Sequence, residues 1–182
     1  RQIQDNSWIV GAYAFYDLRR TEFDNNFSQA TVGIEAMSVE WEARLNGYIP
    51  ESKTEMGNAL NTAQIQSGTV VFRAGVERAF YGIDGEGGAL IQDWNGGDVE
   101  LRGFVGAFHF DTDGAGFQNV SGPRLRLEVR GYDLPWLGTG SRLTVGGEYQ
   151  YDDVRDSQFL AMARLRIPLR PGRQPALTRL QR

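Results

Sequence analysis

The sequence predicts an all-β fold, an antiparallel up-and-down transmembrane β-barrel with about eight strands. Apolar and polar residues alternate with period two along many short segments, as they do in strands with two different faces. Three segments end in paired aromatic residues followed by Asp17, Asp111 or Asp152, a pattern that suits strands meeting a membrane interface. No segment carries the pattern of a helix of domain size, so strands joined by turns account for the chain.

The composition argues against several classes of function. The chain has 182 residues and a formal net charge of −4. No apolar run approaches the roughly 18 residues of a membrane helix. An acidic chain gives no support for nucleic-acid binding, which usually leaves a basic footprint. With no cysteine and one histidine, disulfides, thiolate sites and multi-histidine metal sites are excluded within this sequence. Residue 1 is Arg and no signal peptide is present, so we expect a segment of a longer chain.

The clearest element is a β-hairpin over residues 29–50, in which both arms alternate apolar and charged residues. If Met37 and Ser38 form a two-residue turn, Ile34 faces Trp41 and both apolar sets lie on one side of the sheet. The same alternation predicts strands over residues 7–17, 81–91, 99–111, 123–132, 142–152 and 158–169. The stretches between them are loops and turns, at residues 18–28, 92–98, 111–122, 133–141 and 153–157.

Residues 51–80 are expected to form one long excursion that contains a short hairpin of its own. Residues 69–76 alternate again, and counting them as a membrane strand would give nine strands. The three aromatic-ended strands would then no longer run in one direction. We therefore prefer eight membrane strands. Within residues 99–111, Leu101 and Phe104 differ in parity, which requires either a β-bulge near Gly103 or Gly106 or inward-pointing Phe side chains.

Alternation alone does not distinguish a membrane barrel from a soluble β-sandwich. The apolar face is rich in Ala and Gly, which lipid tolerates and a close-packed core does not favour. The aromatic strand ends favour the barrel further. The polar faces would then form a lumen lined by charges, namely Glu35, Glu42, Arg44, Arg124, Arg126, Glu128, Arg130, Glu148, Arg164 and Arg166. The lipid-facing side chains would include Val32, Ile34, Trp41, Leu45, Leu125, Leu127, Val145 and Leu165, with an aromatic girdle of Tyr13, Phe15, Tyr149 and Tyr151.

Several segments resemble the β-domain of the inverse autotransporters, the intimin and invasin class of adhesins. They are WIVGAYAFYD from Trp8, ATVGIEAMSVEWEARLNGYIP from Ala30, SGPRLRLEVR from Ser121 and LTVGGEYQYDD from Leu143. The likeness covers residues 7–169, and its most specific part is the Phe-Tyr-Asp strand end followed by the hairpin that ends in Asn-Gly-Tyr.

The resemblance implies a twelve-stranded barrel in the bacterial outer membrane, of which residues 1–169 supply about eight strands. Its expected partners are the lipid bilayer, the barrel-assembly machinery and a C-terminal passenger. The passenger is exported through the lumen, and residues 170–182 begin the linker that stays inside. Without the strands that would precede Arg1, this segment could not close the family's barrel.

No catalytic constellation, cofactor motif or metal site emerges from the sequence. The stretch Asp111-Thr-Asp113-Gly lacks the later ligands of a calcium loop, and the glycines after Gly85 are not followed by a helix that would complete a phosphate loop. Glu40 and Glu42 share one face and have the spacing of a catalytic carboxylate pair. Charged pairs recur along the other strands, however, so these two are better interpreted as part of the charged lining of the lumen. A small porin or barrel enzyme remains the alternative function, and a soluble β-sandwich binding module is a third.

Overall fold

The computed structural model is built almost entirely from β-strands and describes residues 2–3, 8–51, 54–57, 61–66, 69–114 and 116–168. Eight long strands form the body of the protein. They are β2 (Trp8–Arg20), β3 (Asn26–Met37), β4 (Trp41–Pro50), β9 (Tyr81–Trp94), β10 (Val99–Asp111), β11 (Val120–Tyr132), β12 (Arg142–Asp152) and β13 (Asp156–Arg166). Among the described residues, no helix is long and apolar enough to cross a membrane.

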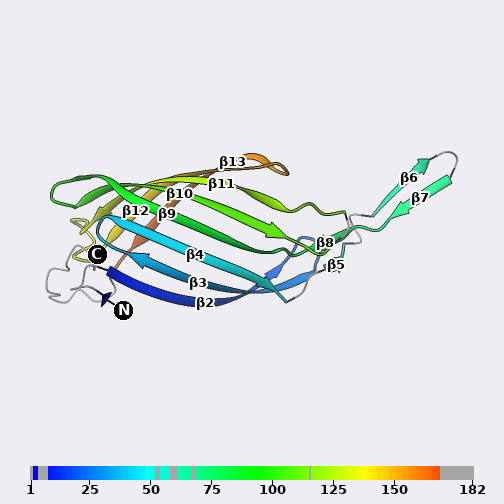
Figure 1. The fold of residues 1–182 in the computed structure, drawn as a ribbon, viewed down its shortest axis with the longest axis horizontal. Coiled ribbons are helices and arrows are strands. Elements are labelled where there is room, and N and C mark those ends of the chain that lie inside the picture. Colours follow the sequence, from blue (N-terminus) through cyan, green and yellow to red (C-terminus); the bar gives the residue numbers. More distant parts are fainter. Residues whose placement is uncertain are drawn as a thin grey trace.

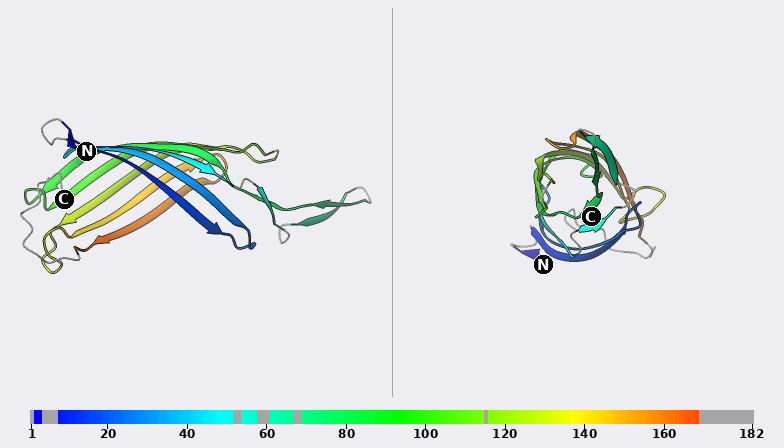
Figure 2. Two further views of the ribbon diagram at one scale, coloured as in Figure 1. Left: turned by 90° about the horizontal axis from the view of Figure 1, so that it is seen from below. Right: turned by 90° about the vertical axis from the view of Figure 1, so that its right-hand side faces the viewer.

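The long strands lie side by side in one antiparallel sheet, in the order in which they occur in the sequence. The short strand β1 (Gln2–Ile3) pairs with the beginning of β2. The sheet curls around a central axis, with one concave and one convex face (Figures 1 and 2). This is the predicted up-and-down topology. In the part of the chain that the structure describes, β13 pairs only with β12, so the curled sheet has two free edges.

The excursion between β4 and β9 folds on itself, as predicted, and adds no strand to the barrel sheet. It contains β5 (Thr54–Met56) paired with β8 (Val76–Arg78), and β6 (Thr62–Gln66) paired with β7 (Thr69–Arg73). It projects beyond one end of the barrel (Figure 1). Its base is held by Glu77, which accepts hydrogen bonds from Thr21 and Asn25 of the β2–β3 turn. The excursion is therefore attached to a neighbouring loop rather than suspended from β4 and β9 alone.

The register of the β3–β4 hairpin differs from the prediction. Ile34 lies opposite Leu45 rather than Trp41, and Met37 lies opposite Glu42. The turn is formed by residues 38–41 and not by Met37 and Ser38 alone. The Ser38 N–H donates a hydrogen bond to the Trp41 carbonyl at 2.7 Å. The Ser38 side chain also accepts from the Trp41 N–H at 2.9 Å, which the sequence pattern did not reveal. Because the shift in pairing is an even number of residues, every side chain keeps its predicted face.

The irregularity expected in residues 99–111 lies in the neighbouring strand. The pairing of β9 with β10 shifts between Leu101 and Arg102, where Ile91 is the extra residue on β9. The strand β10 itself pairs continuously with β11. The prediction of a bulge near Gly103 or Gly106 is therefore wrong. The alternative prediction, that the Phe side chains point inward, is confirmed, since Phe104 and Phe108 are only 5% and 4% exposed.

The two ends of the barrel differ in their aromatic residues and connections. β2, β10 and β12 run in the same direction, as predicted, so their aromatic ends meet at one end of the sheet together with the excursion. The tryptophans lie at the other end, with the starts of β2 and β4, the end of β9 and the β11–β12 connection; they are Trp8, Trp41, Trp94 and Trp136. Long connections are typical of the outer side of bacterial barrels.

Candidate functional site

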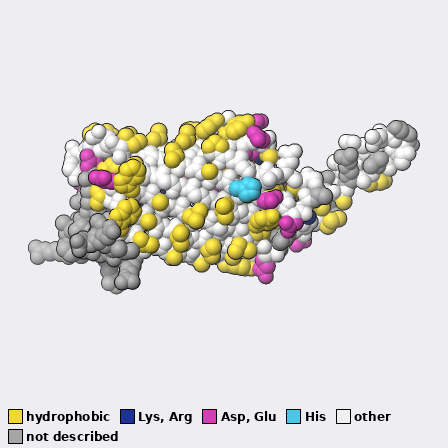
Figure 3. All heavy atoms as spheres, viewed as in Figure 1, with side chains coloured by type: hydrophobic (Ala, Val, Ile, Leu, Met, Phe, Trp, Pro, Cys, Tyr) yellow, Lys and Arg dark blue, Asp and Glu magenta, His cyan; other side chains and the backbone are white. Residues whose placement is uncertain are grey.

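The concave face is polar and the convex face is apolar, the reverse of a soluble β-sandwich. Among the described residues, the only buried hydrophobic side chains are those of Phe104 and Phe108. Buried polar and charged residues outnumber them and include Glu42, Glu100, Arg102, Arg126, Glu128 and Arg130. Hydrophobic side chains are instead spread over the outer wall (Figure 3). This inversion is typical of a transmembrane β-barrel, whose outer wall contacts lipid and whose inner wall contacts water.

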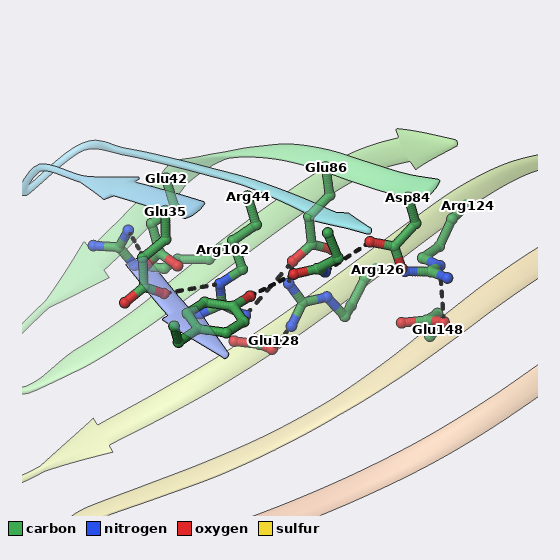
Figure 4. A network of polar contacts seen from close by, with 12 residues as sticks. Glu35, Glu42, Arg44, Asp84, Glu86, Arg102, Arg124, Arg126, Glu128 and Glu148 are labelled. Carbon is green, nitrogen blue, oxygen red and sulfur yellow. Dashed lines mark hydrogen bonds and ion pairs between the residues drawn. The ribbon is translucent and has the colours of Figure 1, made fainter. Parts of the chain in front are cut away.

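Glu42 is the centre of the charge network on the concave face (Figure 4). It lies on β4 and accepts a hydrogen bond from Arg102 of β10 at 2.8 Å. It also accepts two hydrogen bonds from Arg130 of β11, one of them at 3.2 Å. The side chains of Glu42 and Arg102 are only 6% and 5% exposed. One carboxylate thus links three strands that come from distant parts of the sequence.

The network continues from this centre in both directions. Arg102 donates to Glu100 at 2.9 Å, and Glu100 also accepts from the Tyr132 hydroxyl at 3.0 Å. Arg130 donates to Glu128 at 2.9 Å, and Glu128 accepts from Arg126 as well. Each buried arginine therefore has at least one carboxylate partner, which offsets much of the cost of removing its charge from bulk water.

A second branch reaches the middle of the lumen through Glu86 on β9. Arg126 donates to Glu86, and Arg44 lies 3.7 Å from the same carboxylate. Arg44 is also 3.6 Å from Glu35 of β3. These two contacts are longer and more exposed than those of Glu42, so we expect them to contribute little to stability.

A separate cluster surrounds Asp84, nearer to the end that carries the excursion. Asp84 accepts hydrogen bonds from Asn46 at 2.7 Å, from Tyr48 at 3.2 Å and from Arg124 at 3.1 Å. Arg124 also lies 3.3 Å from Glu148 on β12. The cluster joins β4, β9, β11 and β12 across the concave face.

Aromatic rings fill the space between the charges. The guanidinium of Arg126 lies 3.9 Å from the centroid of the Phe104 ring, a favourable cation–π distance. Phe104 faces Gly88 on β9, where a Cβ atom would come within 2.1 Å of the ring. A glycine is required at this position because the ring occupies the place of its side chain.

All ten charges predicted to line the lumen lie on the concave face or at its margin. Eight of the ten take part in the ion pairs described above, and the other two, Arg164 and Arg166, line a cavity on this face near the β13 edge. The eight apolar residues predicted to face lipid are exposed on the outer wall, and the exposed fractions of all eight lie between 48% for Val32 and 57% for Trp41 and Leu127. Contact with lipid and with a lumenal chain stays a prediction.

The girdle prediction needs correction at two of its four residues. Tyr13 and Phe15 face the concave side, where the Tyr13 hydroxyl donates to Asn46 and the Tyr13 ring covers Gly33. Successive residues of β2 alternate between the two faces, so the residues that point outward at this end of the strand are Tyr16 and Leu18. Tyr149 and Tyr151 lie on the outer side, 42% and 40% exposed, and their place in a girdle stays a prediction.

The predicted list of lumen-lining charges omits several residues that the structure places in the network. The period-two alternation of their strands places all of them on the polar face, and this pattern was sufficient to predict them. They are Asp84, Glu86, Glu100 and Arg102. The partnership between Glu42 and Arg130, 88 residues apart, had no signal in the sequence. Outside the spanning strands, hydrogen bonds from Tyr16 and Ser28 lower the pKa of Glu51. Within the described ranges, no group of three or more acidic or histidine side chains could hold a metal ion.

Comparison with known protein families supports what the geometry indicates. The family model described as inverse autotransporter, beta-domain, matches residues 1–104. The chain belongs to this family. No curated protein and no solved structure matches the sequence. As an inverse autotransporter β-domain, the chain is a β-barrel domain of the bacterial outer membrane, with the role of a translocator and membrane anchor. The strands beyond residue 104 continue the same sheet with the same division of faces.

Proposed function

We propose that this β-domain exports a polypeptide that follows it in the chain and displays it at the cell surface, as adhesins of the intimin and invasin class do. Residues 170–182, which lie outside the described residues, would begin the linker. The barrel-assembly machinery would insert the domain into the membrane.

The observation that carries the proposal is the position at which the sheet ends. β13 ends at Arg166, at the end of the barrel opposite the excursion, and Arg166 lines the cavity of the concave face. If the excursion lies outside the cell, the chain beyond β13 starts on the inner side, at the entrance of the lumen. A segment that follows β13 can then reach the surface only by passing through the lumen.

The charge network is compatible with such a passage. Its carboxylates are engaged by arginines of the same sheet, so the wall presents a hydrated and nearly neutral polar surface. A moving polypeptide would find few apolar patches on which to stall. The outer wall, in contrast, is apolar and suits an anchor in lipid.

The test is surface display by the full-length protein carrying an epitope in its C-terminal part. In intact cells, the epitope should be accessible to antibody and to added protease. Thr144→Trp should narrow the concave face and reduce display, whereas its neighbour Val145→Trp, on the outer wall, should leave display unchanged. Retention of the folded barrel in the membrane is checked by its heat-modifiable mobility. An epitope that becomes accessible only after the outer membrane is broken would exclude export and favour a porin.

A further inference from the structure

A short strap of chain at the base of the excursion is bound to the loops on both sides of it. The strap consists of residues 76–80, which are β8 and the two residues before β9. On one side, Glu77 accepts hydrogen bonds from the side chains of Thr21 and Asn25, at 2.8 and 2.6 Å. These two donors belong to the β2–β3 turn, the connection that precedes the excursion at this end of the barrel.

On its other side the strap contacts the β10–β11 loop. Arg78 donates a hydrogen bond to Thr112 at 3.4 Å, and its guanidinium lies 5.4 Å from the centroid of the Phe117 ring. Phe80 meets the same ring edge to face, with 6.3 Å between the two centroids. The strap therefore spans the space between two loops that are not neighbours in the sequence.

A cavity of about 520 Å³ lies beneath the strap. It is lined by the strap and by polar residues of β2 and β3 that include Asp17, Arg19 and Gln29. Asp17 and Arg19 have the parity of Tyr13, which faces the concave side, and Gln29 lies directly opposite Asp17. Seen from this end, the excursion lies in front of the opening of the barrel (Figure 2, right). The strap thus covers the concave face at the mouth of the lumen.

The strap is held in place by few contacts. β8 pairs with β5 through three residue pairs, and the central pair places Glu55 directly opposite Glu77. Like charges in this position destabilise a strand pair, and an isolated pair of strands is marginal in any case. The Nε–H of Arg78 is buried and has no hydrogen-bond partner in the described part of the chain, which is a further cost. The hydrogen bonds of Glu77 to the β2–β3 turn therefore contribute a large share of what keeps the strap closed.

We propose that residues 76–80 form a movable cover over the mouth of the lumen, with Glu77 as its latch and Glu55 as the opposing charge. While Glu77 holds Thr21 and Asn25, the strap closes the cavity. When these hydrogen bonds break, the strap moves off the concave face and uncovers it. The proposal rests on the proposed export function, because the exported polypeptide is what displaces the strap as it leaves the lumen.

The experiment measures how readily the covered cavity is reached from outside. The chain has no cysteine, so Gln29→Cys places a single thiol beneath the strap. Intact cells that carry the full-length protein are treated with a maleimide too bulky to pass through porins. Glu77→Ala should make labelling on the order of fivefold faster, as expected when two hydrogen bonds to a half-exposed carboxylate are lost.

The matched control is Glu55→Ala, which removes the same side chain from the opposite position of the same ladder. Glu55→Ala should label no faster than the parent, because it removes the repulsion and leaves the latch intact. A reference thiol at Ile65→Cys, 80% exposed in the projecting hairpin, should label at one rate in every background. Equal acceleration by the two alanine variants, or no acceleration by Glu77→Ala, overturns the proposal.

A second pair of variants tests the latch from the side of the turn and leaves the excursion unchanged. Thr21→Ala/Asn25→Ala removes both donors and should reproduce the faster labelling, whereas Glu22→Ala, an exposed neighbour in the same turn, should not. Heat-modifiable mobility shows that each barrel is folded. If the double variant labels at the parent rate, Glu77 is not a latch.

Labelling and export are read out separately. Surface display without the predicted difference in labelling would refute the strap alone. The predicted labelling without display would refute export and leave no polypeptide to displace the strap.

Discussion

Replacement of Glu42 by Gln tests whether the charge network stabilises the barrel. The substitution keeps the shape of the side chain and removes the charge that holds Arg102 and Arg130. Glu42 accepts three hydrogen bonds from these two arginines, and its side chain is 6% exposed.

The expected loss of stability follows from the hydrogen bonds that the substitution weakens. A hydrogen bond to a charged group contributes about 1.5–3 kcal/mol and a neutral one about 0.5–1.5 kcal/mol, so each bond loses roughly 1 kcal/mol. Arg102 and Arg130 keep Glu100 and Glu128 as partners, which limits the damage. We expect Glu42→Gln to lower the free energy of unfolding by about 2–3 kcal/mol, slightly less than the loss of a fully isolated buried pair.

The measurement is a urea titration of the protein in lipid vesicles, followed by tryptophan fluorescence and by heat-modifiable mobility. The matched control is Glu40→Gln, which changes an exposed carboxylate two residues away and should alter stability by less than about 0.5 kcal/mol. If the two variants unfold at the same urea concentration, the network contributes nothing measurable and the reasoning is refuted.

Two other substitutions probe the two faces of the sheet. Ile34→Arg places a charge on the outer wall and should cost about 2–4 kcal/mol near the bilayer centre, whereas Ile65→Arg in the projecting excursion should cost almost nothing in the same titration. Equal effects would contradict a lipid-facing wall. Gly88→Val would meet the Phe104 ring at 2.1 Å and should destabilise by about 1–3 kcal/mol, whereas Gly87→Val, with no atom within 4 Å of its Cβ, should be tolerated. A Gly87 variant as unstable as the Gly88 variant would refute this packing.

The sequence determined the faces of the strands more reliably than their partners. The prediction for residues 29–50 assigned each side chain to the correct face although its register was wrong, because an even shift preserves alternation. Tyr13 and Phe15 were misplaced for a related reason. They lie two residues apart and so share one face of β2, but only the pairing of β2 with β3 showed that this is the concave face, where Tyr13 contacts Asn46 and Gly33.

By itself, the sequence determined an eight-stranded antiparallel meander with one apolar and one charged face, since period-two alternation is a local property of each strand. Only the tertiary structure decided which charges meet. Glu42 and Arg130 are brought together by the curl of the sheet and by the order of four strands, neither of which is written into any one segment. The bulge at Ile91 likewise depends on how strands pair, and pairing is a relation between two segments rather than a property of either.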